Sequence, residues 1–147
     1  MLKASVGISL VKVPVSDLAR SLRFYELLFG CKPEFASDAH GWAQFNLGSL
    51  TIALYAAGFG EDDRRPGGSL DFHLLVSELD GLRQRLSARG ACATGGLLCG
   101  ANGSRSMDLT DPDGNVIRLC ERLPSEERRL GTHVRRRRQK VSGVDPA

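Results

Sequence analysis

The stretch VKVPVSDLARSLRFYELLFG, from Val11 to Gly30, decides the fold that we expect for this chain. Its first five residues alternate between valines and other residues, which is the two-residue period of a half-buried strand. A helix follows, because Ser16 or Asp17 can cap its first turn and Gly30 can end it. Its apolar stripe is expected to consist of Leu18, Leu22, Tyr25 and Leu28 or Phe29.

A weaker copy of this stretch lies further along the chain. The segment FHLLVSELDGLRQRLSARG, from Phe72 to Gly90, repeats the order of strand, helix and glycine, with VSEL in place of VSDL. Ser77 and Asp80 have the spacing of a capping box at the start of the second helix. The sequence therefore predicts two related modules.

Short strand-like segments follow each expected helix. In the first module they cover about Glu34–Ser37, Trp42–Leu47 and Leu50–Tyr55. In the second they cover about Cys92–Leu97, Ser104–Thr110 and Asn115–Glu121, and DPDGN has Pro and Gly where a tight turn between the last two strands needs them. The predicted fold class is α+β, with two βαβββ modules whose curled mixed sheets form a ligand cup.

The chain of 147 residues suits one domain of two small modules. We expect this domain over residues 1–124, with module one at about 6–57, a glycine-rich linker at 58–68 and module two at about 69–122. Residues 125–147 form a tail with seven basic and three acidic residues, and this net charge of +4 leaves −1 for the rest of a chain whose total is +3.

This charge distribution argues against nucleic-acid binding by the domain, except for weak contacts through the tail around Arg135–Lys140. The four cysteines lack the spacing of a zinc site, so reduced thiols are expected. No long apolar run resembles a signal peptide or a spanning helix, so the sequence predicts a cytoplasmic protein without membrane contact.

The segment VPVSDLARSLRFYELLFG followed by the late DPDGNVIRLCE resembles the vicinal oxygen chelate superfamily, which groups glyoxalases, extradiol dioxygenases and bleomycin-resistance proteins. The resemblance spans about Ile8 to Glu121. It implies a cup for a small ligand, often completed in a homodimer. It also implies that enzymes of this kind hold a divalent metal on His, Gln or Glu side chains of the first and last strand of each module.

Carried onto this sequence, the metal positions fall at Leu10, Ala53, Asp71 and Arg118. Only Asp71 can ligate, because leucine and alanine offer no lone pair and a guanidinium is a permanent cation. The resemblance and the strand alternation together predict that no metal or other cofactor is bound. His73, as a relocated ligand beside Asp71, is the less favoured reading.

Strand alternation predicts which side chains face the ligand space, because neighbouring residues of a strand point to opposite faces. The candidate ligand-binding residues are Leu10, Lys12, Trp42, Gln44, Tyr55, Asp71, His73, Arg118 and Cys120. Arg118 is expected either to anchor an anionic group of the ligand or to form a structural salt bridge with Asp71, and we hold these two roles open.

Two functions from different classes follow. The first is a metal-free binding protein, similar to the bleomycin-resistance branch, that sequesters a drug or metabolite as a homodimer. Antibiotic resistance itself fits less well, since Lys12 and Arg118 favour an anionic ligand over a cationic glycopeptide. The alternative is an enzyme: a metal-dependent lyase or dioxygenase, or a cofactor-free isomerase that uses His73 and Asp71 as an acid–base pair.

Overall fold

The first module begins with the strand and helix that the opening stretch predicts. The computed structural model describes residues 7–59, 65–67, 72–91, 95–101 and 103–121. The first module contains β1 (Val11–Val15), α1 (Leu18–Phe29), β2 (Phe35–Ser37), a 3-10 turn (Asp38–His40), β3 (Trp42–Asn46) and β4 (Thr51–Ala56). Asp17 caps α1 by accepting the backbone N–H of Arg20 at 2.9 Å, and Gly30 ends the helix with a φ of 68°.

The second module repeats this order. It contains β5 (Phe72–Val76), α2 (Leu79–Ala88), β6 (Leu98–Cys99), β7 (Arg105–Thr110) and β8 (Val116–Glu121). The expected strand at Cys92–Leu97 is wrong where it can be checked, because Gly95–Leu97 are not in a strand and Cys92–Thr94 lie outside the described residues. A turn from Gly100 to Gly103 instead sets the register of β6 on β7, with Leu98 opposite Ser106.

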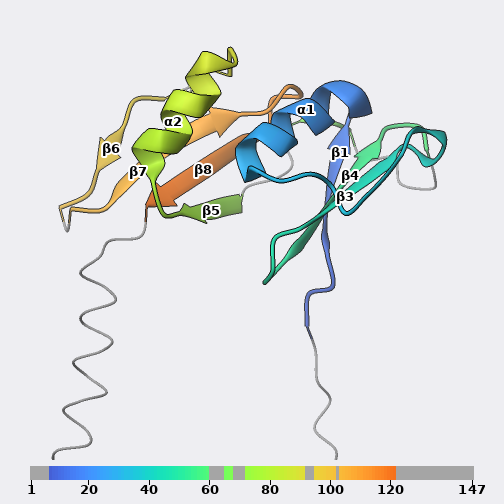
Figure 1. Cartoon of the computed structure of the whole chain (residues 1–147), viewed down its shortest axis with the longest axis horizontal. Helices are drawn as coiled ribbons and strands as arrows, with labels where there is room; N and C mark the ends of the chain where they lie inside the picture. Colours follow the sequence, from blue (N-terminus) through green and yellow to red (C-terminus); the bar gives the residue numbers. More distant parts are fainter. Residues whose placement is uncertain (1–6, 60–64, 68–71, 92–94, 102, 122–147) are drawn as a thin grey trace, which may run out of the picture.

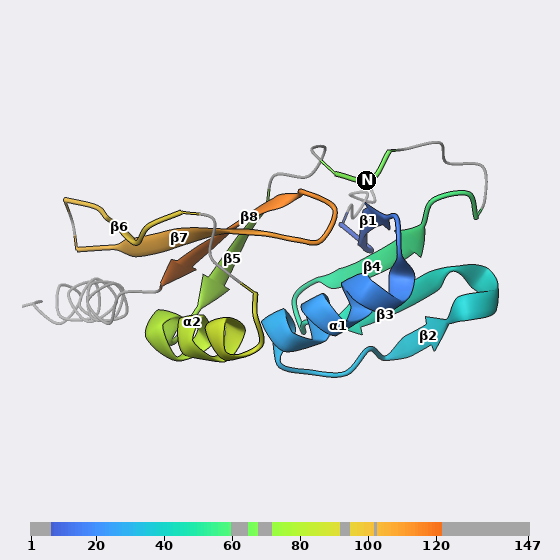
Figure 2. The same cartoon turned by 90° about the horizontal axis from the view of Figure 1, so that it is seen from above.

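Each module forms one mixed four-stranded sheet. The strand orders are β1-β4-β3-β2 and β5-β8-β7-β6, and in both sheets the first strand pairs in parallel with the last. The helices α1 and α2 contact each other and lie side by side in both views of the molecule (Figures 1 and 2). The α+β class and the two βαβββ modules are confirmed, with sheets that remain unclosed.

One apolar core joins the two modules. Inward side chains of β1, β3 and β4 pack with α1, and those of β7 and β8 pack with α2. The buried members of this core are Val13, Val15, Leu18, Tyr25, Leu28, Ala43, Phe45, Ile52, Leu54, Leu79, Leu82, Leu86, Met107, Leu109, Ile117 and Leu119. The faces of the two sheets turned away from these residues are called the helix-free faces below.

The loop between β7 and β8 also ties the modules together. The side chain of Asp111 is buried and accepts a hydrogen bond from the Tyr25 hydroxyl of α1 at 2.8 Å. Burial, followed by the charge and hydrogen bond of Asp111, raises the pKa of the Tyr25 phenol well above its usual range. Asp113 of the same loop accepts hydrogen bonds from the backbone N–H of Ser16, at 3.1 Å, and from its hydroxyl.

These contacts give the DPDGN motif a second role beyond the turn that the sequence predicts. The loop reaches the N-terminus of α1. Ser21 of that helix is buried, and its hydroxyl donates to Asp113 at 3.3 Å. The linker passes close by: Gly67 has a φ of 84°, and a Cβ there would lie 2.1 Å from the carbonyl oxygen of Asp113. Only glycine suits this position.

The start of α2 differs from the sequence expectation. The capping box of Ser77 and Asp80 is wrong: the N-cap residue is Glu78, without a side-chain cap. Glu121 of β8 accepts the free N–H of Leu79 at 3.1 Å, and Asp80 accepts from Arg105 at 2.9 Å. A residue from another element therefore satisfies one of the backbone N–H groups that the start of a helix leaves free.

Within the described residues no helix is long and apolar enough to cross a membrane. The cytoplasmic location stays a prediction. The expected basic tail at 125–147 and most of the linker at 58–68 lie outside the described residues. The proposed division into modules, linker and tail also stays a prediction.

Candidate ligand-binding face

The pairing register of the first sheet places candidate residues in two rows across its helix-free face. Residues directly opposite each other on paired strands point to the same side of a sheet. One row is Phe35, Gln44, Ala53 and Lys12, and the next is Ser37, Trp42, Tyr55 and Pro14. Lys12, Trp42, Gln44 and Tyr55, which the sequence predicts as ligand-facing, therefore share one face.

Tyr55 is the chemically distinctive residue of this face. The residue is only 4% exposed, and its buried hydroxyl has no hydrogen-bond partner among the described residues. The Lys12 ammonium lies over the ring, 5.0 Å from its centroid. A buried hydroxyl without a partner costs about 1–3 kcal/mol, so a polar group that pairs with it gains this energy.

The second sheet carries charge at the equivalent place. Asp108, Arg118 and His73 form one row on its helix-free face. Arg118 holds Asp108 in a two-point ion pair, from Nε to Oδ1 at 2.7 Å and from Nη2 to Oδ2 at 2.9 Å. Hydrogen bonds from Arg118 hold the pKa of the Asp108 carboxyl below its usual range, and the charges of Arg118 and His73 act in the same direction.

The neighbouring row of this sheet is less polar. Leu98, Ser106, Cys120 and Leu75 follow one another across β6, β7, β8 and β5. Leu75 is 58% exposed, and Val116 on the same face is 47% exposed. Cys120 is half-buried and carries a free thiol. This part of the face offers apolar surface for a ligand or a partner to cover.

The structure places most of the candidate residues in two groups, one on the helix-free face of each sheet. Leu10 lies directly before β1, half-buried, and Asp71 lies outside the described residues. The salt bridge expected between Arg118 and Asp71 therefore stays a prediction. Among the described residues Arg118 pairs with Asp108, a partner that the sequence analysis did not name although alternation with the buried Met107 and Leu109 places it on this face.

The residues at the implied metal positions do not fit a divalent ion. Ala53 is fully buried beside Lys12, and Arg118 lies beside His73 and is engaged by Asp108. If the alignment shifted by two residues on each first strand, Lys12 and His73 would replace Leu10 and Asp71. In either alignment a single side chain can ligate, and one ligand makes no metal site. The described residues hold no cluster of three His, Cys, Asp or Glu suited to a metal.

Comparisons with known proteins agree with this architecture. Residues 7–119 match the family model of the Glyoxalase/Bleomycin resistance protein/Dioxygenase superfamily. A glyoxalase/bleomycin resistance protein from Catenulispora acidiphila is 27% identical with a TM-score of 0.63, and the match covers 81% of this chain and 100% of that one. A superfamily member from Sphaerobacter thermophilus is 26% identical with a TM-score of 0.65, covering 80% and 98% of the two chains.

A more distant neighbour shares the fold alone. A lactoylglutathione lyase from Agrobacterium tumefaciens is 20% identical with a TM-score of 0.63, and the match covers 80% of this chain and 95% of that one. No curated protein sequence matches the chain significantly. Function is therefore argued from the side chains on the helix-free faces.

Proposed function

Because the chain belongs to the Glyoxalase/Bleomycin resistance protein/Dioxygenase superfamily, we propose that it binds a small organic molecule on its helix-free faces without a metal. The superfamily covers enzymes and binding proteins on one fold, so membership does not choose between them. The observation that carries the proposal is the set of residues at the implied metal positions: Leu10, Ala53 and Arg118 cannot ligate a divalent ion. A drug or metabolite is then sequestered by side chains alone.

The first sheet suggests what this ligand contains. Trp42 is half-buried and offers aromatic surface, and the buried Tyr55 ring carries a hydroxyl that needs an acceptor. Lys12 adds a positive charge above the same ring, on a long and flexible side chain whose movement opens the hydroxyl to a ligand. These features favour a planar molecule with a carboxylate or a similar anionic acceptor.

Arg118 has a secondary place in this proposal. Its Nε and Nη2 already bond to Asp108, so part of its charge is neutralised before any ligand arrives. The side chain is 42% exposed and contributes a further contact from the second sheet. The main anionic contact is therefore assigned to Lys12 and Tyr55, with Arg118 as a support.

A homodimer is part of the proposal. Exposed apolar side chains lie on both sheets, at Phe35 and Leu98 on the outer strands and at Leu75 and Val116 on the second helix-free face. A two-fold partner that covers them would enclose the ligand between two copies. Light scattering at micromolar concentration tests this, with a dimer expected and a monomer as the contrary result.

The binding proposal is tested by thermal shift with EDTA present throughout. Wild-type protein is screened against small planar carboxylates, and hits are repeated on Tyr55→Phe and on Tyr25→Phe, a matched change on the helix side. We expect at least one compound to raise Tm in the wild type and in Tyr25→Phe, with the shift lost in Tyr55→Phe. Stabilisation that appears only when a divalent metal replaces the EDTA would overturn the proposal, as would equal shifts in all three proteins.

A further inference from the structure

A second candidate site lies away from the helix-free faces, in the groove between the two helices. This groove has a volume of about 530 Å³. Both helices contribute to its walls, and the residues after α1 close one end. The lining residues are Arg23, Glu26, Leu27, Gly30, Cys31, Lys32, Arg85 and Arg89.

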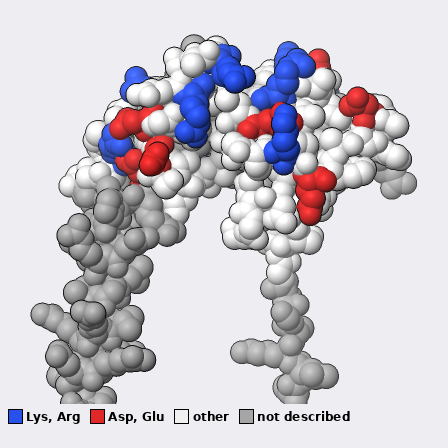
Figure 3. All heavy atoms as spheres, in the orientation of Figure 1, with Lys and Arg blue, Asp and Glu red and all other residues white. Residues whose placement is uncertain are grey.

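The groove carries an excess of positive charge. Its single carboxylate, Glu26, is already used, since its Oε2 lies 2.7 Å from the Lys32 ammonium. Three guanidinium groups remain, from Arg23, Arg85 and Arg89, and none of them is hydrogen-bonded or ion-paired to another described residue. Basic side chains gather over both helices on this side of the molecule (Figure 3). Residues 1–124 have a net charge of −1, so the positive charge around the groove is a local feature.

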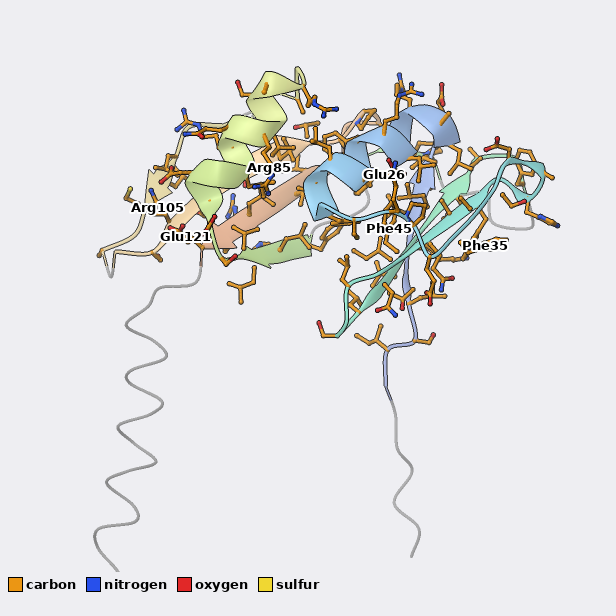
Figure 4. All side chains as sticks on the ribbon, in the orientation of Figure 1. Glu26, Phe35, Phe45, Arg85, Arg105 and Glu121 are labelled. Carbon is orange, nitrogen blue, oxygen red and sulfur yellow. The ribbon has the colours of Figure 1, made fainter. Side chains whose placement is uncertain are left out.

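The positions of the arginines suit one shared anionic ligand. Arg85 lies in the last turns of α2 and Arg89 is its C-cap residue, and both line the groove. Arg23 of α1 lines the same groove, and Figure 4 shows Arg85 and Glu26 on the two helices that flank it. Leu27 adds an apolar surface to the lining.

Helix electrostatics account for only part of this arrangement. Cations near the C-terminus of a helix are stabilised by its dipole, which explains Arg85 and Arg89. Arg23 lies in the middle of α1 and gains nothing from that effect. Three like charges around one groove repel each other, and an anion bound between them removes this repulsion.

We propose that the groove between α1 and α2 binds a small phosphorylated molecule. Guanidinium groups match the spacing of phosphate oxygens and bind them through paired hydrogen bonds. The volume is within the range of small-molecule pockets, about 300–1,000 Å³. The phosphate groups lie between Arg23, Arg85 and Arg89, and the organic part lies against Leu27.

Binding of inorganic pyrophosphate to the whole chain, followed by calorimetry, tests the charge arrangement. Arg85→Gln is compared with Arg83→Gln, which removes the same charge from the same helix outside the groove. We expect pyrophosphate affinity to fall about tenfold in Arg85→Gln, equal to about 1.4 kcal/mol, and to change less than about twofold in Arg83→Gln. Absence of binding to the wild type, or equal loss in both variants, would overturn the proposal.

The cysteines allow a second measurement that does not depend on the variants. Cys31 is exposed and lines the groove, whereas Cys99 is exposed on β6 and is not among the residues that line it. Both thiols are labelled with neutral iodoacetamide and quantified by peptide mass spectrometry. Pyrophosphate is expected to slow labelling of Cys31 severalfold and to leave Cys99 unchanged.

Two outcomes of these experiments argue against the site. Equal labelling of Cys31 with and without pyrophosphate would show that the anion does not occupy the groove. A single-stranded oligonucleotide that protects Cys31 at lower phosphate concentration than pyrophosphate would show that the groove is part of a nucleic-acid surface. Either result rejects a small phosphorylated ligand, and neither affects the proposal for the helix-free faces.

Discussion

The two modules have the same order of elements and differ in how their polar side chains join those elements. In module one, the turn between β3 and β4 is held locally, with the Gly48 N–H donating to Asn46 at 2.9 Å. In module two, the equivalent loop carries Asp111 and Asp113, which bond to Tyr25 and Ser16 of module one. One turn closes a hairpin, and the other closes a hairpin and fastens two modules.

The helix-free faces differ in the same way. Lys12 and His73 occupy equivalent positions on the first strands, next to Ala53 and Arg118 on the last strands. Module one surrounds its position with aromatic and apolar side chains, whereas module two places an ion pair there. A repeated backbone therefore presents two different surfaces: a lysine beside an aromatic ring on the first sheet, and an arginine–carboxylate pair on the second.

The largest expected effect comes from breaking the loop that fastens the modules. Asp111→Ala removes the acceptor for Tyr25 and for the backbone and side chain of Asn115. Buried groups left unpaired cost about 1–3 kcal/mol each, so we expect a loss of about 3 kcal/mol or more in unfolding free energy. Asn46→Ala, in the exposed turn of module one, should cost less than about 1 kcal/mol by urea unfolding. Similar losses in both variants would contradict the difference between the two turns.

A smaller difference in stability is expected between two variants that each lose one tyrosine hydroxyl. Tyr25→Phe removes a hydroxyl bonded to Asp111 and should cost about 1–2 kcal/mol. Tyr55→Phe removes a hydroxyl that no other described residue bonds, and it should be neutral or slightly stabilising. Thermal melts of the two variants under one buffer decide this. A clear loss of stability in Tyr55→Phe would mean that its hydroxyl is satisfied in the folded protein.

The ion pair of module two should matter less for stability than the loop. Arg118 is 42% exposed and Asp108 is 26% exposed, so solvent screens their interaction. Arg118→Met is expected to lower unfolding free energy by about 1 kcal/mol or less and to weaken ligand affinity modestly. A loss of about 3–5 kcal/mol would instead indicate a buried pair.

The smallest expected effect is the pH dependence of the stability that the Arg118–Asp108 pair contributes. The lowered pKa of Asp108 means that its contribution to stability is present above its unfolded pKa of about 4 and is lost as pH falls through the folded pKa. The stability difference between wild type and Asp108→Asn should therefore shrink below about pH 4. Urea unfolding of both proteins at pH 7 and pH 3 measures this difference. A difference that is larger at pH 3 would show that the pKa of Asp108 is not lowered in the folded protein.

The sequence predicted the elements that depend on neighbours close in the chain. Asp17 and Gly30 delimit α1 as expected, because a cap and a glycine stop act within one turn. The capping box at Ser77 failed because Glu121, 42 residues after Leu79, supplies the cap instead. The residues near a helix start do not show whether a side chain from a distant part of the sequence bonds its free N–H groups.

The candidate site shows the same limit. Alternation placed Lys12, Tyr55 and Arg118 on the helix-free faces, since parity follows from strand geometry alone. It did not give Asp108 as the partner of Arg118, because the pairing depends on the register of β7 against β8. The groove arginines were not predicted, since the contact of α1 with α2 places Arg23 opposite Arg85.

The most direct test of metal-free binding is the metal content of the protein that holds its ligand. The purified chain is loaded with the best carboxylate from the thermal-shift screen, then analysed by elemental and native mass spectrometry before and after EDTA. We expect far less than one divalent metal per chain and full retention of the ligand after EDTA. About one Zn, Ni, Fe or Mn per chain, removed by EDTA together with the ligand and lost in His73→Ala, would contradict the account.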